Sequence, residues 1–310
     1  MFQVSKLKAS LACLLIFFSW FSVAQGARLY LEPNSGQYQL DQTFIVKVKI
    51  DTEQECVNAI KINLSYDKDV LEVIDFSRGK SIISFWLELP KIDEKEGEIY
   101  FSGGIPGGYC GRIPGDPGEG DILGKIIFKI QDLLIAEKEK SVTEIKFLEN
   151  SQILLNDGLG TKAKLTFRGA KFEISEKTTQ APNQWEQEIL EDKTLPEPFK
   201  ILILEDSKIF EGKYSIIFQT VDKQTGIDYY EVKEGEKEWE LVKSPYLLED
   251  QELKSIIKVR AVDKSGNERI AEYVPKKPFP WGTIIMILVI GGLMWIIFRK
   301  IYVSQKRKTQ

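Results

Sequence analysis

Apolar and polar residues alternate with a period of two along several stretches of the chain. The clearest stretch is 43–50, where every second position is apolar: Phe44, Val46, Val48 and Ile50. Shorter stretches repeat the pattern at Ile60, Ile62 and Leu64, at Ile99 and Phe101, at Ile126, Phe128 and Ile130, and at Leu165 and Phe167. Residues two apart share one face of a strand, so each stretch predicts a strand with one buried face. Turn-forming sequences at 33–36, 66–69 and 156–158 separate them. The pattern predicts an all-β fold built as a sandwich.

The alternation lapses over residues 175–198 and then resumes. Residues 178–184 have the composition of a linker, and Pro196 and Pro198 follow. Strand patterns continue over 199–275, a length that suits an immunoglobulin-like or fibronectin-type sandwich with Trp239 as its core aromatic residue. Two similar turns, 221–226 and 262–267, each follow an apolar strand.

Both ends of the chain carry an apolar segment beside basic residues. Residues 1–27 combine Lys6 and Lys8 with an apolar run and small residues near Ala24, which predicts a secretory signal peptide; an N-terminal membrane anchor is the alternative. Residues 281–303 begin with an uncharged apolar run and predict one transmembrane helix. The basic tail 304–310 places the C-terminus in the cytoplasm and the domains outside the cell, on a single-pass cell-membrane protein.

Composition and charge exclude several classes of function. The chain has 310 residues, no histidine and a net charge of −4, with the basic residues of both ends flanking an acidic middle. The absence of histidine excludes Ser-His-Asp triads and His-ligated zinc, and the acidic middle argues against nucleic acid. We expect no enzyme activity, no catalytic residues, no cofactor and no metal. The stretch Gly103–Gly124, rich in glycine and proline, is expected to be a loop, either a ligand loop or a plain connection between strands.

One segment resembles a known family. Residues 58–73, Asn-Ala-Ile-Lys-Ile-Asn-Leu-Ser-Tyr-Asp-Lys-Asp-Val-Leu-Glu-Val, are similar to the cohesin signature, in which a strand ends in Tyr-Asp-Pro and continues to Leu-Glu-Val. Residues 97–102 and 120–130 resemble later strands of that family. The resemblance covers 28–174 and implies a nine-stranded jelly-roll sandwich, related to carbohydrate-binding modules, that captures dockerin modules. Lys68 stands where the family has proline, and Ala59 and Lys61 stand where dockerin-binding members tend to carry Asn and Asp.

The resemblance also indicates where a ligand would bind. The family uses a flat sheet face, which here implies the outer side of the Tyr-Asp strand with Lys61, Asn63 and Ser65. Trp86, Tyr100 and Tyr109 are candidates for stacking on a polysaccharide; packing in the core or in loops is the alternative for each.

Two cysteines, Cys56 and Cys110, remain once the predicted signal peptide is removed. An exported compartment and an even number of cysteines favour a disulfide between them, and two free thiols are the alternative.

Two functions remain open at this point. In the first, a membrane-anchored surface protein binds a secreted, dockerin-like protein or a polysaccharide. In the second, both sandwiches are spacers or adhesion units of the cell envelope.

Overall fold

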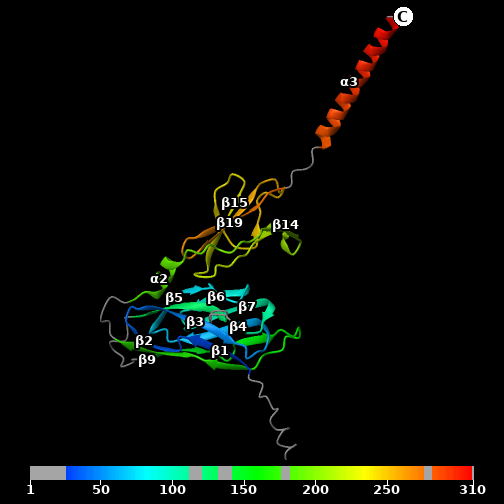
Figure 1. The fold of residues 1–310 in the computed structure, drawn as a ribbon. Coiled ribbons are helices and arrows are strands. Elements are labelled where there is room, and N and C mark those ends of the chain that lie inside the picture. Colours follow the sequence, from blue (N-terminus) through cyan, green and yellow to red (C-terminus); the bar gives the residue numbers. More distant parts are fainter. Residues whose placement is uncertain (1–25, 112–120, 132–141, 176–181, 276–280, 309–310) are drawn as a thin grey trace, which may run out of the picture.

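Two β-sandwiches make up most of the molecule. The computed structural model describes residues 26–111, 121–131, 142–175, 182–275 and 281–308. The first sandwich holds β1 to β12 and the second holds β13 to β19, with helix α2 between them along the chain (Figure 1). The predicted signal peptide lies outside the described residues except at its last two positions, and Ala27 already belongs to β1.

The first sandwich consists of two sheets. The five-stranded sheet has the order β11 (Leu165–Arg168), β1 (Ala27–Glu32), β3 (Thr43–Asp51), β8 (Ile122–Ile130) and β5 (Leu71–Ser77). The seven-stranded sheet has the order β2 (Ser35–Gln39), β12 (Ala170–Ser175), β9 (Val142–Phe147), β4 (Val57–Tyr66), β7 (Glu98–Tyr109) and β6 (Phe85–Asp93), with β10 (Gln152–Leu155) also paired to β4. Most neighbouring strands are antiparallel, but β1 with β11 and β2 with β12 are parallel.

The alternating positions of the sequence form the core between these sheets. Phe44, Val46 and Val48 on β3 are fully buried, as are Phe101 on β7 and Phe128 on β8. These side chains belong to one continuous hydrophobic cluster, which confirms the alternation as the signal for this sandwich. Phe167 is the exception: it is 39% exposed and stacks on Phe147 with the ring centroids 5.8 Å apart.

The described part of the first sandwich contains twelve strands where nine were expected. The N-terminal segment is divided at Pro33-Asn34, so that β1 pairs with β3 in one sheet and β2 pairs with β12 in the other. Proline has no backbone N–H to continue a ladder, which ends β1 at this point. Short strands β10 and β11, four residues each, extend the two sheets further.

The expected loop Gly103–Gly124 begins later than predicted. Strand β7 continues to Tyr109 and includes the first four glycines of that stretch. A Cβ atom on Gly103 would lie 2.5 Å from the carbonyl oxygen of Phe85, so glycine is required here by the close approach of β6. The prediction was wrong for 103–109 because glycine was interpreted as a turn former rather than as a site of close strand approach. Residues 112–120 lie outside the described residues.

The second sandwich has a three-stranded and a four-stranded sheet. The first has the order β13 (Leu202–Asp206), β14 (Ile209–Ile217) and β17 (Tyr246–Leu247), and the second has the order β16 (Glu240–Val242), β15 (Ile227–Glu234), β18 (Ile257–Asp263) and β19 (Glu268–Tyr273). Its buried core is Ile216, Phe218, Val232, Leu248, Ile257 and Val259. Trp239 is not part of this cluster, contrary to expectation, because it precedes the short strand β16 and lies under the guanidinium of Arg260, 4.5 Å from its ring centroid.

The segment expected as a linker contains a helix. Helix α2 (Gln184–Glu191) begins after Asn183, whose side chain accepts a hydrogen bond from the backbone N–H of Glu186. Trp185 is buried on this helix, and its neighbour Gln184 accepts a hydrogen bond from the backbone N–H of Ile45. The part of the linker that the structure describes, from residue 182, therefore contacts the first sandwich through α2.

Hydrogen bonds that involve side chains and backbone join the two sandwiches directly. The hydrogen bonds, donor first, are Ser77 Oγ to Thr225 O at 2.6 Å, Arg78 Nη2 to Ile227 O at 3.3 Å, Gln219 Nε2 to Ser84 O at 2.8 Å and Lys264 Nζ to Asp75 Oδ2 at 2.6 Å. A Cβ atom on Gly79 would lie 2.1 Å from the carbonyl oxygen of Gln224, so the turn after β5 meets the second sandwich backbone to backbone. The end of β5 and two turns of the second sandwich therefore form one packed junction (Figure 1).

Helix α3 (Trp281–Lys308) follows the second sandwich and covers the predicted transmembrane segment. Its large apolar side chains from Ile285 to Phe298 are 49–76% exposed. Within the described residues, no helix combines the length and the apolarity required to cross a membrane.

Candidate functional site

The outer surface of β4, β7 and β6 is the sheet face on which we expected a ligand to bind. In the register of β4 with β7, Lys61 is opposite Ser102, and the adjacent pair Ile62 and Phe101 is fully buried. Successive residues of a strand point to opposite faces, so Lys61 and Ser102 point away from the core. We call the outward residues of these three strands the binding face.

Lys61 and Ser65 are accessible on this face, but Asn63 is not. Asn63 is only 8% exposed. Its side-chain Nδ2 donates to Asn150 O at 3.3 Å, and its backbone carbonyl accepts a hydrogen bond from Ser151 Oγ at 3.1 Å. The segment leading into β10 covers this part of β4, so Asn63 presents little of its side chain on the binding face.

Trp86 points toward the core instead of toward a ligand. It is opposite Gly103 on the inward side of β7, and its ring lies 5.8 Å from that of Phe101 and 6.3 Å from that of Phe76. Arg78 lies over the same ring, 5.8 Å from its centroid. The absence of a side chain on Gly103 makes room for the indole, so Trp86 packs at the margin of the core.

The other aromatic candidates, Tyr100 and Tyr109, do not form a row with Trp86. Tyr109, at the end of β7, is partly buried and packs against the main core cluster. Tyr100 is on the outer face, opposite Asn63 and Lys91, and the Nζ of Lys91 lies 5.6 Å from its ring centroid. A flat platform for a sugar chain requires several exposed coplanar rings, and these residues do not provide one.

Exposed apolar side chains on β6 lie along the edge of the sheet beside this face, and the sequence pattern did not reveal their exposure. Phe85, Leu87 and Leu89 are 55%, 73% and 50% exposed. Their alternation is visible in the sequence, but alternation by itself predicts a buried face. They are exposed because β6 is the last strand of its sheet and its register with β7 shifts after Trp86 and again after Glu88.

Charged groups of both signs surround these apolar residues. Ser102 Oγ donates to Glu88 Oε2 at 3.0 Å, and Lys61 and Lys91 are exposed nearby on β4 and β6. An apolar group bordered by mixed charges is the composition of a protein-binding surface, with a few anchor side chains inside a polar rim.

A disulfide holds one end of the face together. Cys56 immediately precedes β4 and Cys110 immediately follows β7, and their Cα atoms are 3.9 Å apart. The bond lies beside the pair Val57 and Tyr109, the last register pair of the two strands. It therefore fixes β4 against β7 where the ladder ends.

Comparisons with known proteins find similarity in structure alone. No protein-family model and no curated protein matches the chain. Among solved structures it is similar to the cohesin of a type I cohesin–dockerin complex from Clostridium thermocellum, with 17% identity, a TM-score of 0.39, and coverage of 49% of this chain and 94% of the other.

Two further cohesins give comparable values. The seventh type I cohesin of the scaffoldin ScaB from Pseudobacteroides cellulosolvens has 14% identity and a TM-score of 0.38, covering 51% of this chain and 97% of the other. The sixth cohesin of scaffoldin B from Acetivibrio cellulolyticus, solved with a dockerin, has 16% identity and a TM-score of 0.37, covering 49% and 100%.

Proposed function

We propose that the first sandwich captures a dockerin-type protein partner on the binding face. The observation that carries this proposal is the exposed apolar edge of β6, with Phe85, Leu87 and Leu89 beside the charged residues of β4 and β6. Large apolar side chains exposed together on a rigid sheet are typical of interaction surfaces. The cohesin-like sequence 58–73 contributes β4 to the same sheet and supports a partner of the dockerin class.

A protein partner suits this face better than a polysaccharide does. The inward orientation of Trp86 and the partial burial of Tyr109 leave Tyr100 as the aromatic candidate on the outer surface. A chain of sugars gains its affinity from stacking on several rings, whereas a protein partner can bury Leu87 and Leu89 and pair with the charges around them.

The cell-surface location is a proposal from the sequence. The signal-like residues 1–27 and the basic tail after residue 303 favour a chain anchored by its C-terminal segment with both sandwiches outside. Protease added to intact cells should remove the sandwiches and leave the last residues protected. Protection of the sandwiches from the protease would contradict this topology.

Binding is tested with the full chain in mild detergent, immobilised and exposed to a panel of purified dockerin modules. We expect at least one module to bind, and Leu87→Asp to weaken that binding by at least tenfold. Leu241→Asp is the matched control, because Leu241 is 69% exposed but lies on β16 of the second sandwich. Retention on insoluble glycans with no dockerin bound would contradict the proposal, as would equal losses from both variants.

A further inference from the structure

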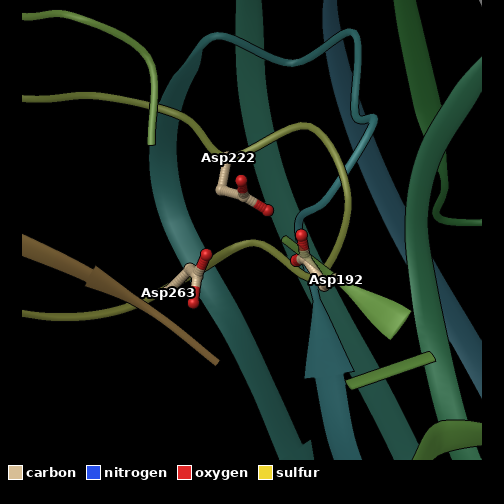
Figure 2. A group of neighbouring side chains, drawn as sticks. All are labelled: Asp192, Asp222 and Asp263. Atoms are coloured by element: carbon tan, nitrogen blue, oxygen red, sulfur yellow. The ribbon is translucent and has the colours of Figure 1, made fainter. Parts of the chain in front are cut away.

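Three buried aspartates from separate parts of the chain meet at the junction of the two sandwiches. Asp192 ends helix α2, Asp222 lies between β14 and β15, and Asp263 is the last residue of β18. Each side chain is at most 2% exposed, and one carboxylate oxygen of each lies within 4.8 Å of the others. Figure 2 shows the three carboxylates directed toward a shared space between their loops.

One oxygen of this cluster is buried without a hydrogen-bond partner. Asp222 Oδ1 accepts three backbone N–H groups, from Gln224, Thr225 and Gly226, all at 2.9 Å. Asp222 Oδ2 has no partner in the described part of the chain and is shielded from solvent. Burying a carboxylate oxygen without a donor costs free energy, so this atom indicates a ligand that the protein alone does not supply.

Neighbouring donors hold the other two carboxylates in place. Asp192 Oδ2 accepts from the backbone N–H and the hydroxyl of Thr225, at 3.1 and 2.6 Å. Asp263 Oδ1 accepts from the backbone N–H groups of Ser265 and Asn267. Hydrogen bonds to backbone fix the carboxylates before a ligand binds, which lowers the ordering cost of binding.

No cation of the described residues pairs with this cluster. None of the three aspartates takes part in an ion pair within 4.0 Å among the residues described. Arg78 lines the same hollow between the sandwiches as Asp222, but its guanidinium donates to Ile227 O and lies over Trp86. Three buried carboxylates in one place therefore lack a bound counter-charge.

We propose that Asp192, Asp222 and Asp263 bind one Ca²⁺ ion. The ligand atoms are carboxylate oxygens, which suit a hard cation. Two oxygens on opposite sides of Ca²⁺ are about 4.8 Å apart, given Ca–O distances of about 2.4 Å. The three carboxylate oxygens lie within that span of one another, so one Ca²⁺ ion can contact all three. Mg²⁺ demands near-ideal octahedral geometry and gives up its water reluctantly, whereas Ca²⁺ accepts irregular oxygen cages, so Ca²⁺ suits carboxylates from three separate loops better.

The ion would join the linker to the turns that contact the first sandwich. Thr225 contacts both the aspartate cluster and the first sandwich. Its N–H and hydroxyl donate to Asp192, and its carbonyl accepts from Ser77 Oγ of the first sandwich. Asp263 is followed by Lys264, which forms the ion pair with Asp75. Ca²⁺ therefore fixes the orientation of one sandwich relative to the other, a role that is independent of the proposed partner binding.

Calorimetric titration of Ca²⁺ into the full chain, first stripped with EDTA, tests the site. We expect one Ca²⁺ per chain, with an affinity in the range of extracellular calcium modules, about 10⁻⁴ to 10⁻³ M, and weaker binding of Mg²⁺. Asp222→Asn should lower the affinity by at least tenfold, because the amide keeps an oxygen for the three backbone N–H groups but removes the charge.

Asp250→Asn is the matched control. Asp250 also accepts several backbone N–H groups of its own turn, from Glu252, Lys254 and Ser255, but lies apart from the cluster. This variant should bind Ca²⁺ as the unchanged chain does. If Asp222→Asn fails to fold, Asp263→Asn provides the same comparison.

Hydrogen exchange provides the second readout. Ca²⁺ should slow amide exchange at 222–226 and 263–267 in the unchanged chain, and not in Asp222→Asn. The proposal is overturned if the unchanged chain binds no Ca²⁺ at 10-fold above the expected range, if Mg²⁺ binds equally well, or if Asp222→Asn retains full affinity. If two of the carboxylates instead share a proton, the unchanged chain should bind no Ca²⁺, and Asp222→Asn should be more stable than the unchanged chain in EDTA.

Discussion

Lys264 of the second sandwich and Asp75 of the first form a two-pronged ion pair, with Nζ 2.8 and 2.6 Å from the two carboxylate oxygens. The side chains are 15% and 29% exposed, so water screens this pair less than it screens the surface pairs. The contact joins residues 189 positions apart in the sequence.

A double-mutant cycle with Lys264→Ala and Asp75→Ala should therefore show coupling. We expect about 1 kcal/mol in the free energy of unfolding, at the upper end for partly exposed pairs. Lys254 and Glu252, which are 78% and 70% exposed, are the control pair and should show almost none. Equal coupling energies in both cycles would mean that the interdomain pair stabilises the fold no more than an exposed surface pair does.

Reduction of Cys56–Cys110 should destabilise the first sandwich. The bond joins residues 54 positions apart, and closing such a loop stabilises the fold by about 4 kcal/mol on the chain-entropy model. Denaturant titration with and without reductant measures the change. A Cys56→Ser, Cys110→Ser double variant should match the reduced chain and ignore reductant; coinciding curves for the oxidised and reduced chains would contradict the prediction.

Phe128→Ala should be among the most destabilising single changes in the first sandwich. Phe128 is fully buried and its ring lies 6.0 Å from that of Phe44 and 5.6 Å from that of Tyr66. Removing a buried aromatic ring costs about 3–5 kcal/mol. Phe167→Ala, at a position that is 39% exposed, should cost much less. Similar losses of unfolding free energy in the two variants would show that this part of the core relaxes around the cavity.

Lys125 should make stability depend on pH below 10.5, its ordinary pKa. Its side chain is 2% exposed, and it donates to the Glu188 carboxylate and to Gln224 O. Burial lowers the pKa of Lys125 below its ordinary value of 10.5, and Glu188 opposes this in part. Between the folded and unfolded pKa values the unfolded chain binds more protons, so stability rises with pH across that window.

The comparison with Lys125→Met isolates this effect. The unfolding free energy of the unchanged chain, minus that of Lys125→Met, should increase as the pH rises toward 10.5. Denaturant titrations at a series of pH values measure the difference. A flat difference, or one that falls with pH, would show that the folded chain does not perturb this lysine.

Lys61→Glu should weaken partner binding without unfolding the first sandwich. Lys61 is exposed on β4, and a reversed charge there meets the same partner surface with the opposite sign. A captured dockerin module should bind at least tenfold more weakly, with an unchanged melting temperature. Unaltered affinity would place the contact elsewhere on the sheet.

Strand positions of the first sandwich were predictable because alternation reports burial directly. Positions such as Phe44 and Phe128 are buried on the faces that the pattern assigns. The pattern could not show that Asn63 is covered, because this depends on Ser151 and β10, which are distant in sequence. It could not show that Leu87 is exposed, because alternation does not identify the last strand of a sheet.

The sequence indicates a similarity between two of the three aspartates of the cluster, but not the third. The turns that contain Asp222 and Asp263 are recognisably similar, each with Val-Asp-Lys after an apolar strand. Asp192 resembles neither turn and comes from a segment with linker composition. That it meets the other two follows from how α2 packs, which is a property of the tertiary structure alone.

The parallel pairing of β12 with β2 affects how the chain responds to tension. Five consecutive residues of β12, Lys171 to Ser175, pair with β2, and the chain leaves toward the second sandwich directly after them. A force applied to the chain beyond β12 would act along this strand, so all of these pairs would share it in shear instead of breaking one by one. The first sandwich would thus resist extension strongly when it is pulled at its C-terminal end, and single-molecule stretching from its two ends measures that resistance.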